Sequence, residues 1–219
     1  MGITSVFEPG KDGWHFQNWG EKDDYCIDSC EFSWDLYRQT YMGISPSKSI
    51  AAPEDLAFYE IFKKCAEQGN CGGLSLLALA LFKFGGYMGF CSPASFYTGT
   101  KFPSETGDKR WKCTDREDLH RAINILQARQ FSAHGIENFL DVVGSGNLNN
   151  ADTAYNRAKE LLGKGDYPVL SIAQDAIGEA AHTVIPYNLG QYSDGTRFME
   201  IWDSNHPYDK DPAHYQGSG

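Results

Sequence analysis

The sequence predicts an α+β protein in which helices come first and an antiparallel sheet follows. Apolar residues recur at helical spacing over residues 51–165, whereas residues 1–50 are irregular and rich in glycine, aspartate and aromatics. Residues 166–219 contain short β-branched and aromatic segments bounded by turn residues. Helices followed by strands are typical of this fold class. The chain has 219 residues, 41% of them hydrophobic, and no linker, so we expect one domain over residues 1–219.

A central helix is predicted to follow a break that contains glycine. Pro53 and the acidic residues after it suit the first turn of a helix, and that helical pattern stops at Gln68-Gly69-Asn70. The stretch from Cys71 to Phe84 is apolar nearly all round. A helix without a polar face must be buried, so we expect this one to lie in the middle of the protein and to end at Gly85-Gly86.

Shorter patterns predict the remaining elements. Three further helices are expected where apolar residues keep helical spacing, over residues 115–126, 136–143 and 151–163. Three strands are expected over residues 167–173, 183–189 and 197–202, and Ser193-Asp194-Gly195 predicts a hairpin between the last two. The N-terminal aromatics are expected to be core rather than a ligand platform, and they are Trp14, Phe16, Trp19, Phe32, Trp34 and Tyr37.

Charge and hydropathy argue against several classes of function. The net charge is -10, from 19 basic and 29 acidic residues, and it repels phosphate backbones, so no nucleic-acid binding is expected. No run approaches the roughly 20 apolar residues that a membrane span requires. The first residues lack the basic-then-apolar layout of a signal peptide. A cytoplasmic location and delivery or secretion by another route both stay open.

The cysteines suggest reduced thiols and no metal site. An even number would suit three disulfides in a secreted protein, but the chain is large for a fold that depends on disulfides. The closely spaced pair Cys26 and Cys30 has no second pair at zinc-like spacing, so neither a metal nor another cofactor is expected. The six cysteines are Cys26, Cys30, Cys65, Cys71, Cys91 and Cys113.

Cys71 stands where a nucleophilic thiol would be expected. At the start of a helix, free backbone N–H groups and the helix dipole stabilise a thiolate, which is the nucleophilic form. The adjacent Gly72 and Gly73 would let a substrate approach the backbone, and nearby N–H groups could bind an oxyanion. A lone cysteine is more often a small core residue. The sequence Gly-Asn-Cys-Gly-Gly, however, is a poor core sequence and a good turn.

A histidine and a carboxylate or amide follow in the order that a catalytic triad would need. His182 begins a predicted strand after two alanines, and an imidazole with a pKa near 6.5 suits proton transfer at neutral pH. The next strand ends at Asp203, with Asn205 two residues on. An antiparallel partner strand would bring Asp203 or Asn205 back beside His182 to orient the ring. A structural histidine followed by an ordinary turn is the plainer interpretation.

At these residues the sequence resembles the papain-like cysteine peptidases, and especially the bacterial branch that includes bacteriocin-processing-like peptidases. The matching stretches cover a small part of the chain, namely residues 69–74, 182–187 and 202–207. The resemblance implies a papain-like fold, in which a buried catalytic helix packs on a C-terminal antiparallel sheet. It implies Cys71 as nucleophile, His182 as general base and then acid, and Asp203 as orienting group.

The resemblance also bears on the oxyanion donor and the cleft. Plant-type enzymes carry an oxyanion glutamine six residues before the cysteine, and that register would put Leu74 at the nucleophile position, so the bacterial register is preferred. Gln68 is then the nearest side-chain donor, with Asn70 as the alternative. Gly72, Gly73 and Trp202 are expected to line the substrate cleft. The fold normally continues beyond Asp203, which leaves a small barrel or one domain of a longer multidomain protein.

Three functions are compatible with this constellation. The first is a cysteine peptidase that hydrolyses peptide or isopeptide bonds in a protein or peptide substrate through an acyl-enzyme. The second is an acyltransferase, a transglutaminase-like enzyme or a deamidase that uses the same triad. The third is a binding or toxin module without catalytic activity. The cleft decides between an amine and water as acceptor, and the sequence does not.

Overall fold

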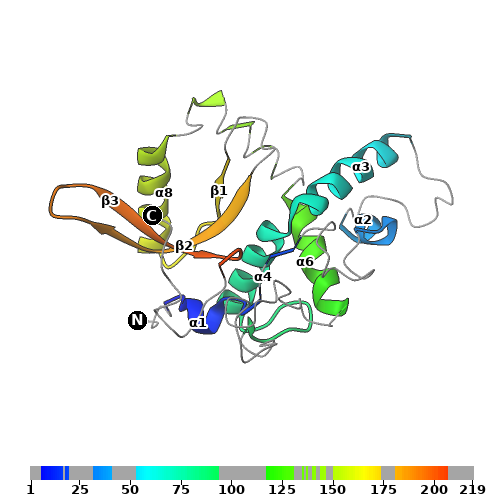
Figure 1. Ribbon diagram of the computed structural model, residues 1–219, viewed down its shortest axis with the longest axis horizontal. Helices are drawn as coiled ribbons and strands as arrows, with labels where there is room; N and C mark the ends of the chain where they lie inside the picture. The colour runs from blue at the N-terminus through cyan, green and yellow to red at the C-terminus, as the bar shows by residue number, and fades with distance from the viewer. Residues whose placement is uncertain are drawn as a thin grey trace, which may run out of the picture.

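The computed structural model describes residues 6–16, 18–19, 32–40, 53–93, 117–130, 135, 137, 140–141, 144–146, 150–173 and 181–206. These residues form a mixed α+β structure with six helices and a small antiparallel sheet, so the α+β part of the prediction is confirmed, while the papain-like fold stays a prediction (Figure 1). The helices are α1 (Pro9–Asp12), α2 (Trp34–Thr40), α3 (Pro53–Gln68), α4 (Cys71–Phe84), α6 (Glu117–Arg129) and α8 (Ala151–Gly163). The strands are β1 (Leu170–Ile172), β2 (His182–Gln191) and β3 (Arg197–Asp203).

Helix α4 lies between the helical side and the sheet, as its apolar sequence predicts. It packs against α6 on one side and against β2 on the other (Figure 1). It begins at Cys71 and ends before Gly85, whose φ of 68° and N–H bond to the carbonyl of Leu81 form a left-handed helix cap. The break before it also has a backbone cause, because Gly69 has a φ of 138° that residues with a side chain rarely adopt.

The sheet has the order β1-β2-β3, and both pairs of neighbours are antiparallel. The predicted hairpin is confirmed, with the N–H of Tyr192 donating to the carbonyl of Thr196 at 2.8 Å. Strand β1 is shorter than predicted and β2 is longer, because β2 pairs with β3 as far as Gln191. A register shift follows Pro186, which has no N–H to give to the ladder.

The N-terminal segment is not irregular throughout, since α1 and α2 form within it. Its aromatics are core, as predicted: Trp14, Phe16 and Trp19 join the cluster around α4, while Phe32 and Tyr37 pack with Phe62. Trp34 is half-buried beside this second cluster. Helix α8 contacts β2, so residues 151–163 belong in space with the β part (Figure 1).

Several predicted features lie partly or wholly outside the described residues. Most of the helix expected over residues 136–143 is among them. Cys26, Cys30 and Cys113 also lie outside, as does the side chain of Cys65. Cys71 and Cys91 are free thiols. None of the helices in the described part combines the length and hydrophobicity that crossing a bilayer requires.

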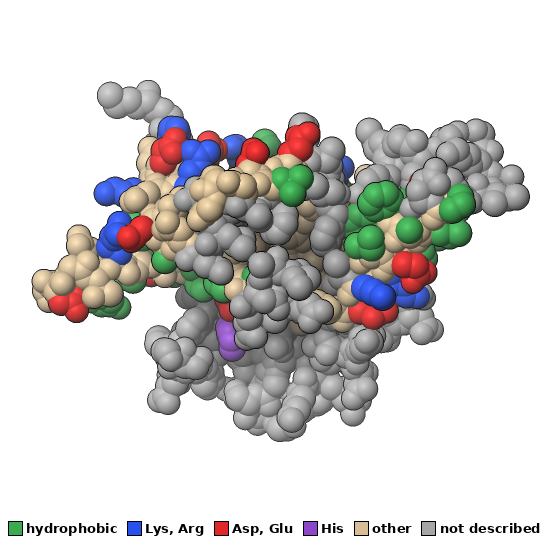
Figure 2. Space-filling view, turned by 90° about the horizontal axis from the view of Figure 1, so that it is seen from above, with side chains coloured by type: hydrophobic (Ala, Val, Ile, Leu, Met, Phe, Trp, Pro, Cys, Tyr) green, Lys and Arg blue, Asp and Glu red, His purple; other side chains and the backbone are tan. Residues whose placement is uncertain are grey.

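The two ends of the molecule differ in surface chemistry (Figure 2). Hydrophobic side chains gather over α3, where Leu56, Phe58 and Ile61 are each about half-exposed. Charged side chains of both signs alternate over α8 and the hairpin, where Glu160 pairs with Arg157 and Lys164. These exposed pairs contribute little to stability individually, so the fold depends on the core around α4.

Close contact between α4 and α6 depends on a glycine, which leads to a stability prediction. A Cβ at Gly73 would lie 2.2 Å from the carbonyl oxygen of Ile123, whereas a Cβ at Gly163, in α8, would meet no atom within 4 Å. Gly73→Ala should therefore lower the free energy of unfolding by about 1–3 kcal/mol, because the backbones must separate. Gly163→Ala is the matched control and should leave it unchanged or raise it slightly. Urea unfolding followed by circular dichroism measures both, and equal midpoints for the two variants would contradict this packing.

Candidate active site

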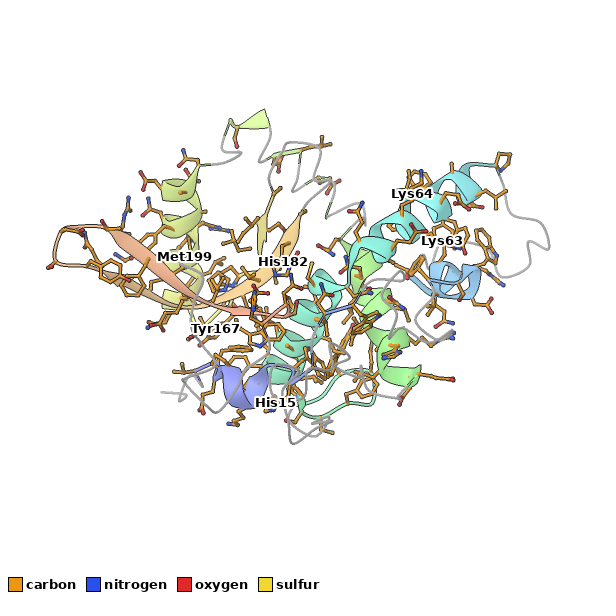
Figure 3. All side chains as sticks on the ribbon, in the orientation of Figure 1. His15, Lys63, Lys64, Tyr167, His182 and Met199 are labelled. Atoms are coloured by element: carbon orange, nitrogen blue, oxygen red, sulfur yellow. The ribbon has the colours of Figure 1, made fainter. Side chains whose placement is uncertain are left out.

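Cys71, His182 and Asp203 each stand at an end of a regular element. Cys71 is the first residue of α4, His182 is the first of β2, and Asp203 is the last of β3. Figure 3 places His182 between the sheet and α4. Antiparallel pairing sets Asp203 opposite Val184 on β2, which returns the end of β3 to the start of β2. Residues far apart in the sequence are thereby gathered at one junction.

The imidazole of His182 contacts Asp203 through one ring nitrogen. Its Nε2 lies 2.6 Å from Oδ1 of Asp203, and the same oxygen accepts the backbone N–H of Asn205 at 2.7 Å. The two side chains are partly exposed, at 23% for His182 and 21% for Asp203. With Nε2 held by the carboxylate, Nδ1 is the nitrogen left for another partner.

Cys71 is hydrogen-bonded to His182 and is more enclosed than the histidine. Its relative exposure is 7%. Burial by itself raises the pKa of a thiol, but hydrogen bonds with His182 and Thr183 hold the pKa of Cys71 below its ordinary value. Thr183 is held in turn, because its carbonyl accepts the hydroxyl of Ser75, on α4, at 3.4 Å. The first turn of α4 and the start of β2 are thus bonded together around the thiol.

The pKa values of His182 and Asp203 are also shifted from their ordinary values. The hydrogen bond to Asp203, followed by that to Cys71, raises the pKa of His182 to about 9. Burial would raise the pKa of Asp203, but the hydrogen bonds from His182 and from the N–H of Asn205 keep it below its usual value. An acidic thiol beside a basic imidazole favours a thiolate–imidazolium pair at neutral pH.

Two backbone N–H groups at the start of α4 are available to an oxyanion. Within the part of the chain that the structure describes, nothing accepts from the N–H groups of Cys71 or Gly72. The next two are occupied, because Gly73 donates to Oε1 of Gln127 at 2.8 Å and Leu74 donates to the carbonyl of Asn70 at 2.9 Å. Backbone donors next to a nucleophile are the usual elements of an oxyanion hole.

The two side chains predicted as oxyanion donors are placed differently. Gln68 is exposed at the last residue of α3. Asn70 is 1% exposed, and its side-chain amide donates to the carbonyl of Trp19 at 3.1 Å. Asn70 therefore supports the loop before α4 from inside the core, and the oxyanion roles of Gln68 and Asn70 stay predictions.

The three residues predicted to line the cleft all make close packing contacts. A Cβ at Gly72 would lie 2.1 Å from the side chain of Gln130, and Gly73 touches the backbone of α6. Trp202 is 1% exposed and covers Gly13, where an added Cβ would meet its indole nitrogen at 2.3 Å. The glycines let α4 approach α6 closely, and Trp202 fills the core beneath the sheet. A role of Gly72, Gly73 and Trp202 in lining a substrate cleft stays a prediction.

Two residues at the site carry contacts that the sequence did not predict. Asn205, the alternative third residue, lies beside the other ring nitrogen, with its Nδ2 3.5 Å from Nδ1 of His182. Asn18 contacts Asn205 and the backbone of Asn70, across 187 and 52 residues of sequence. No local signal singles out Asn18, because His15 and Gln17 are also polar residues between Trp14 and Trp19.

A groove lies apart from these residues. It has a volume of about 710 Å³ and is bordered by residues 6–11 and by Tyr187, Asn188 and Glu200. None of the residues around the Cys71 thiol contributes to its walls. The groove therefore gives no information about a substrate for the thiol.

Comparisons of the chain with protein-family models, with curated proteins and with solved structures give no match. Its function is therefore inferred from the geometry of the site, and no family is assigned.

Proposed function

We propose that the chain is a cysteine hydrolase that cleaves peptide or isopeptide bonds, with Cys71 as nucleophile, His182 as base and Asp203 as orienting group. One observation carries the proposal: the imidazole is bonded to a carboxylate at Nε2 and to a thiol whose pKa is lowered. A nucleophile, a base and a group that orients the base are the parts that acyl transfer requires. The α+β arrangement, with the thiol starting a buried helix beside an antiparallel sheet, supports a papain-like relationship.

The first half of the proposed reaction forms an acyl-enzyme. Nδ1 of His182 takes the proton of Cys71, and the thiolate attacks the carbonyl carbon of the substrate. The N–H groups of Cys71 and Gly72 stabilise the oxyanion. The tetrahedral intermediate then breaks its carbon–nitrogen bond, Nδ1–H protonates the leaving amine, and a thioester remains on Cys71.

The second half returns the enzyme to its starting state. His182 removes a proton from water, the hydroxide attacks the thioester carbon, and the carbon–sulfur bond breaks. The substrate leaves as a carboxylic acid, and Cys71 and His182 regain their original protonation. Asp203 stays ionised throughout and stabilises the imidazolium in both halves, in keeping with its lowered pKa.

Thiol reactivity tests the proposal without a known substrate. Cys91 is exposed and Cys71 is buried, so accessibility alone predicts faster labelling of Cys91. An activated thiolate reverses this order, and we expect iodoacetamide at pH 7 to modify Cys71 at least about 10-fold faster than Cys91. Peptide mapping by mass spectrometry follows both rates in one sample.

The control for this experiment is His182→Ala. The variant should slow labelling of Cys71 to the rate of Cys91 or below and leave the rate of Cys91 unchanged. Slow labelling of Cys71 in the unmodified chain, with no effect of His182→Ala, would rule out a catalytic thiol. If labelling behaves as expected, adding a primary amine during cleavage of a peptide library distinguishes hydrolysis from transfer by the product formed.

A further inference from the structure

Asn18 joins three segments that meet at the proposed active site. Its Oδ1 accepts the N–H of Asn70 at 2.7 Å, and its Nδ2 donates to Oδ1 of Asn205 at 3.0 Å. Its own N–H donates to the carbonyl of Ser204 at 2.8 Å. Asn70 directly precedes the nucleophile, and Asn205 follows Asp203 by one intervening residue. The start of α4 is thereby tied to the end of β3.

The backbone N–H of Asn70 fixes the direction of the hydrogen bonds through Asn18. A backbone N–H can only donate, so the atom of Asn18 that faces Asn70 must be its carbonyl oxygen. The amide nitrogen of Asn18 then faces Asn205, which must turn its own carbonyl oxygen toward it. The amide nitrogen of Asn205 is left facing His182, where it lies 3.5 Å from Nδ1.

Space for this arrangement comes from Gly69. A Cβ at this position would lie 2.8 Å from Nδ2 of Asn18, and the φ of 138° is one that other residues rarely adopt. A side chain at position 69 would push Asn18 out of reach of Asn205. The glycine therefore serves the placement of Asn18 as well as the break before α4.

An amide N–H that faces Nδ1 favours the ring form in which Nδ1 carries no proton and can accept a hydrogen bond. The ring proton then sits on Nε2, where Asp203 accepts it, and Nδ1 is ready to receive the proton of Cys71. We propose that Asn18 is a positioning residue that, through Asn205, selects this form of His182 and restrains its protonation. This inference rests on the proposed function, because it assigns the selection to the base of that reaction.

The groups that act on His182 can be named from each neighbouring element. Cys71 on α4 and Asp203 on β3 are titratable, and both favour the protonated ring. His206 acts electrostatically on Asp203. Strand β1 places the uncharged Ile172 opposite His182. The amide of Asn205 thus opposes the two groups that promote protonation.

Asn18→Asp tests the proposal because it should reverse the hydrogen bond between position 18 and Asn205, and with it the contact between Asn205 and His182. A carboxylate accepts at both oxygens. One oxygen can keep the hydrogen bond from the N–H of Asn70, but the other can only accept a hydrogen bond from the amide nitrogen of Asn205, so the Asn205 amide must turn over. The carbonyl oxygen of Asn205 then faces Nδ1 and accepts a hydrogen bond from the protonated ring. We expect the pH midpoint of Cys71 alkylation by iodoacetamide to fall by about one unit, the size of effect that one hydrogen bond gives.

The added negative charge needs its own control, which is Asn18→Asp combined with Asn205→Ala. The charge is retained in this double variant, but the amide that transmits the reversal is gone. We expect most of the shift caused by Asn18→Asp to disappear in the Asn205→Ala background. Equal shifts in the two backgrounds would show a direct effect of charge and overturn the proposal.

A second variant covers the case in which Asn18→Asp does not fold. Asn205→Ala alone removes the N–H from Nδ1, so it should also lower the alkylation midpoint, and an unchanged or higher midpoint overturns the proposal. Failure of the proposed function has a different signature. If Cys71 is not selectively alkylated in the unmodified chain, the hydrolase proposal and this inference fall together. If it is selectively alkylated but its midpoint is insensitive to these variants, only the inference about Asn18 fails.

Discussion

Replacing Cys71 with alanine should abolish turnover, with a loss of about 10⁴-fold or more in kcat. The buried thiol at the start of α4 is bonded to the imidazole of His182, and no other group on the proposed pathway can form the thioester. Alanine fills nearly the same space, so the fold and peptide binding should be kept. The rate of cleavage of the best member of a peptide library measures the loss.

Cys91→Ala is the matched control for this prediction. Cys91 is an exposed free thiol outside the site, and its removal should leave kcat and KM unchanged. A peptidyl epoxide adds a covalent readout, because it should increase the mass of the unmodified chain and of Cys91→Ala but not of Cys71→Ala. Full cleavage by Cys71→Ala would remove the thiol from the mechanism.

Replacing Asp203 with alanine should slow turnover by about 10²–10⁴-fold. The hydrogen bond from His182 Nε2 to this carboxylate is the largest influence that raises the pKa of His182 to about 9. The imidazolium therefore persists until the pH approaches about 9 in the unmodified chain. Without Asp203 its pKa falls, so the alkaline limb of the pH–rate profile should move to lower pH.

Asn205→Ala is the comparison that tests the assignment of the third residue. Asn205 contacts Nδ1 at 3.5 Å, a longer contact than the 2.6 Å between Asp203 and Nε2. Its removal should reduce kcat by less than about 10-fold and should not move the alkaline limb of the pH–rate profile to lower pH. If Asn205→Ala is slower than Asp203→Ala, the orienting role belongs to Asn205.

Local patterns were sufficient to predict the longer helices and the existence of the three strands. Helix α4 was predictable from residue 71 to residue 84 because its sequence is apolar on all faces and glycines stand on both sides. Strand ends were less predictable, since they depend on the partner: β2 extends to Gln191 only because Arg197 pairs with it. The short helices α1 and α2 were missed because four and seven residues are too few to show a period.

The placement of the site residues was predictable only where the order of the elements determines it. Cys71, His182 and Asp203 stand at element ends, so a helix followed by an antiparallel hairpin was enough to bring them together as candidates. Long-range packing decides the rest. A glycine pair beside a cysteine is the same in sequence whether or not it packs against a helix, and only the structure shows that Gly73 meets the backbone of α6 and Gly72 the side chain of Gln130.

The distance in sequence between Asn18 and its partners also determines when the site can assemble. Asn18 forms hydrogen bonds with Asn70, which is 52 positions later in the sequence, and with Asn205, which is 187 positions later. Contacts this remote form late in folding, since the loops that they close carry a large entropy cost. The thiol of Cys71 should therefore lack the base that we propose for it until β3 has docked on β2, so selective alkylation of Cys71 should appear late in refolding.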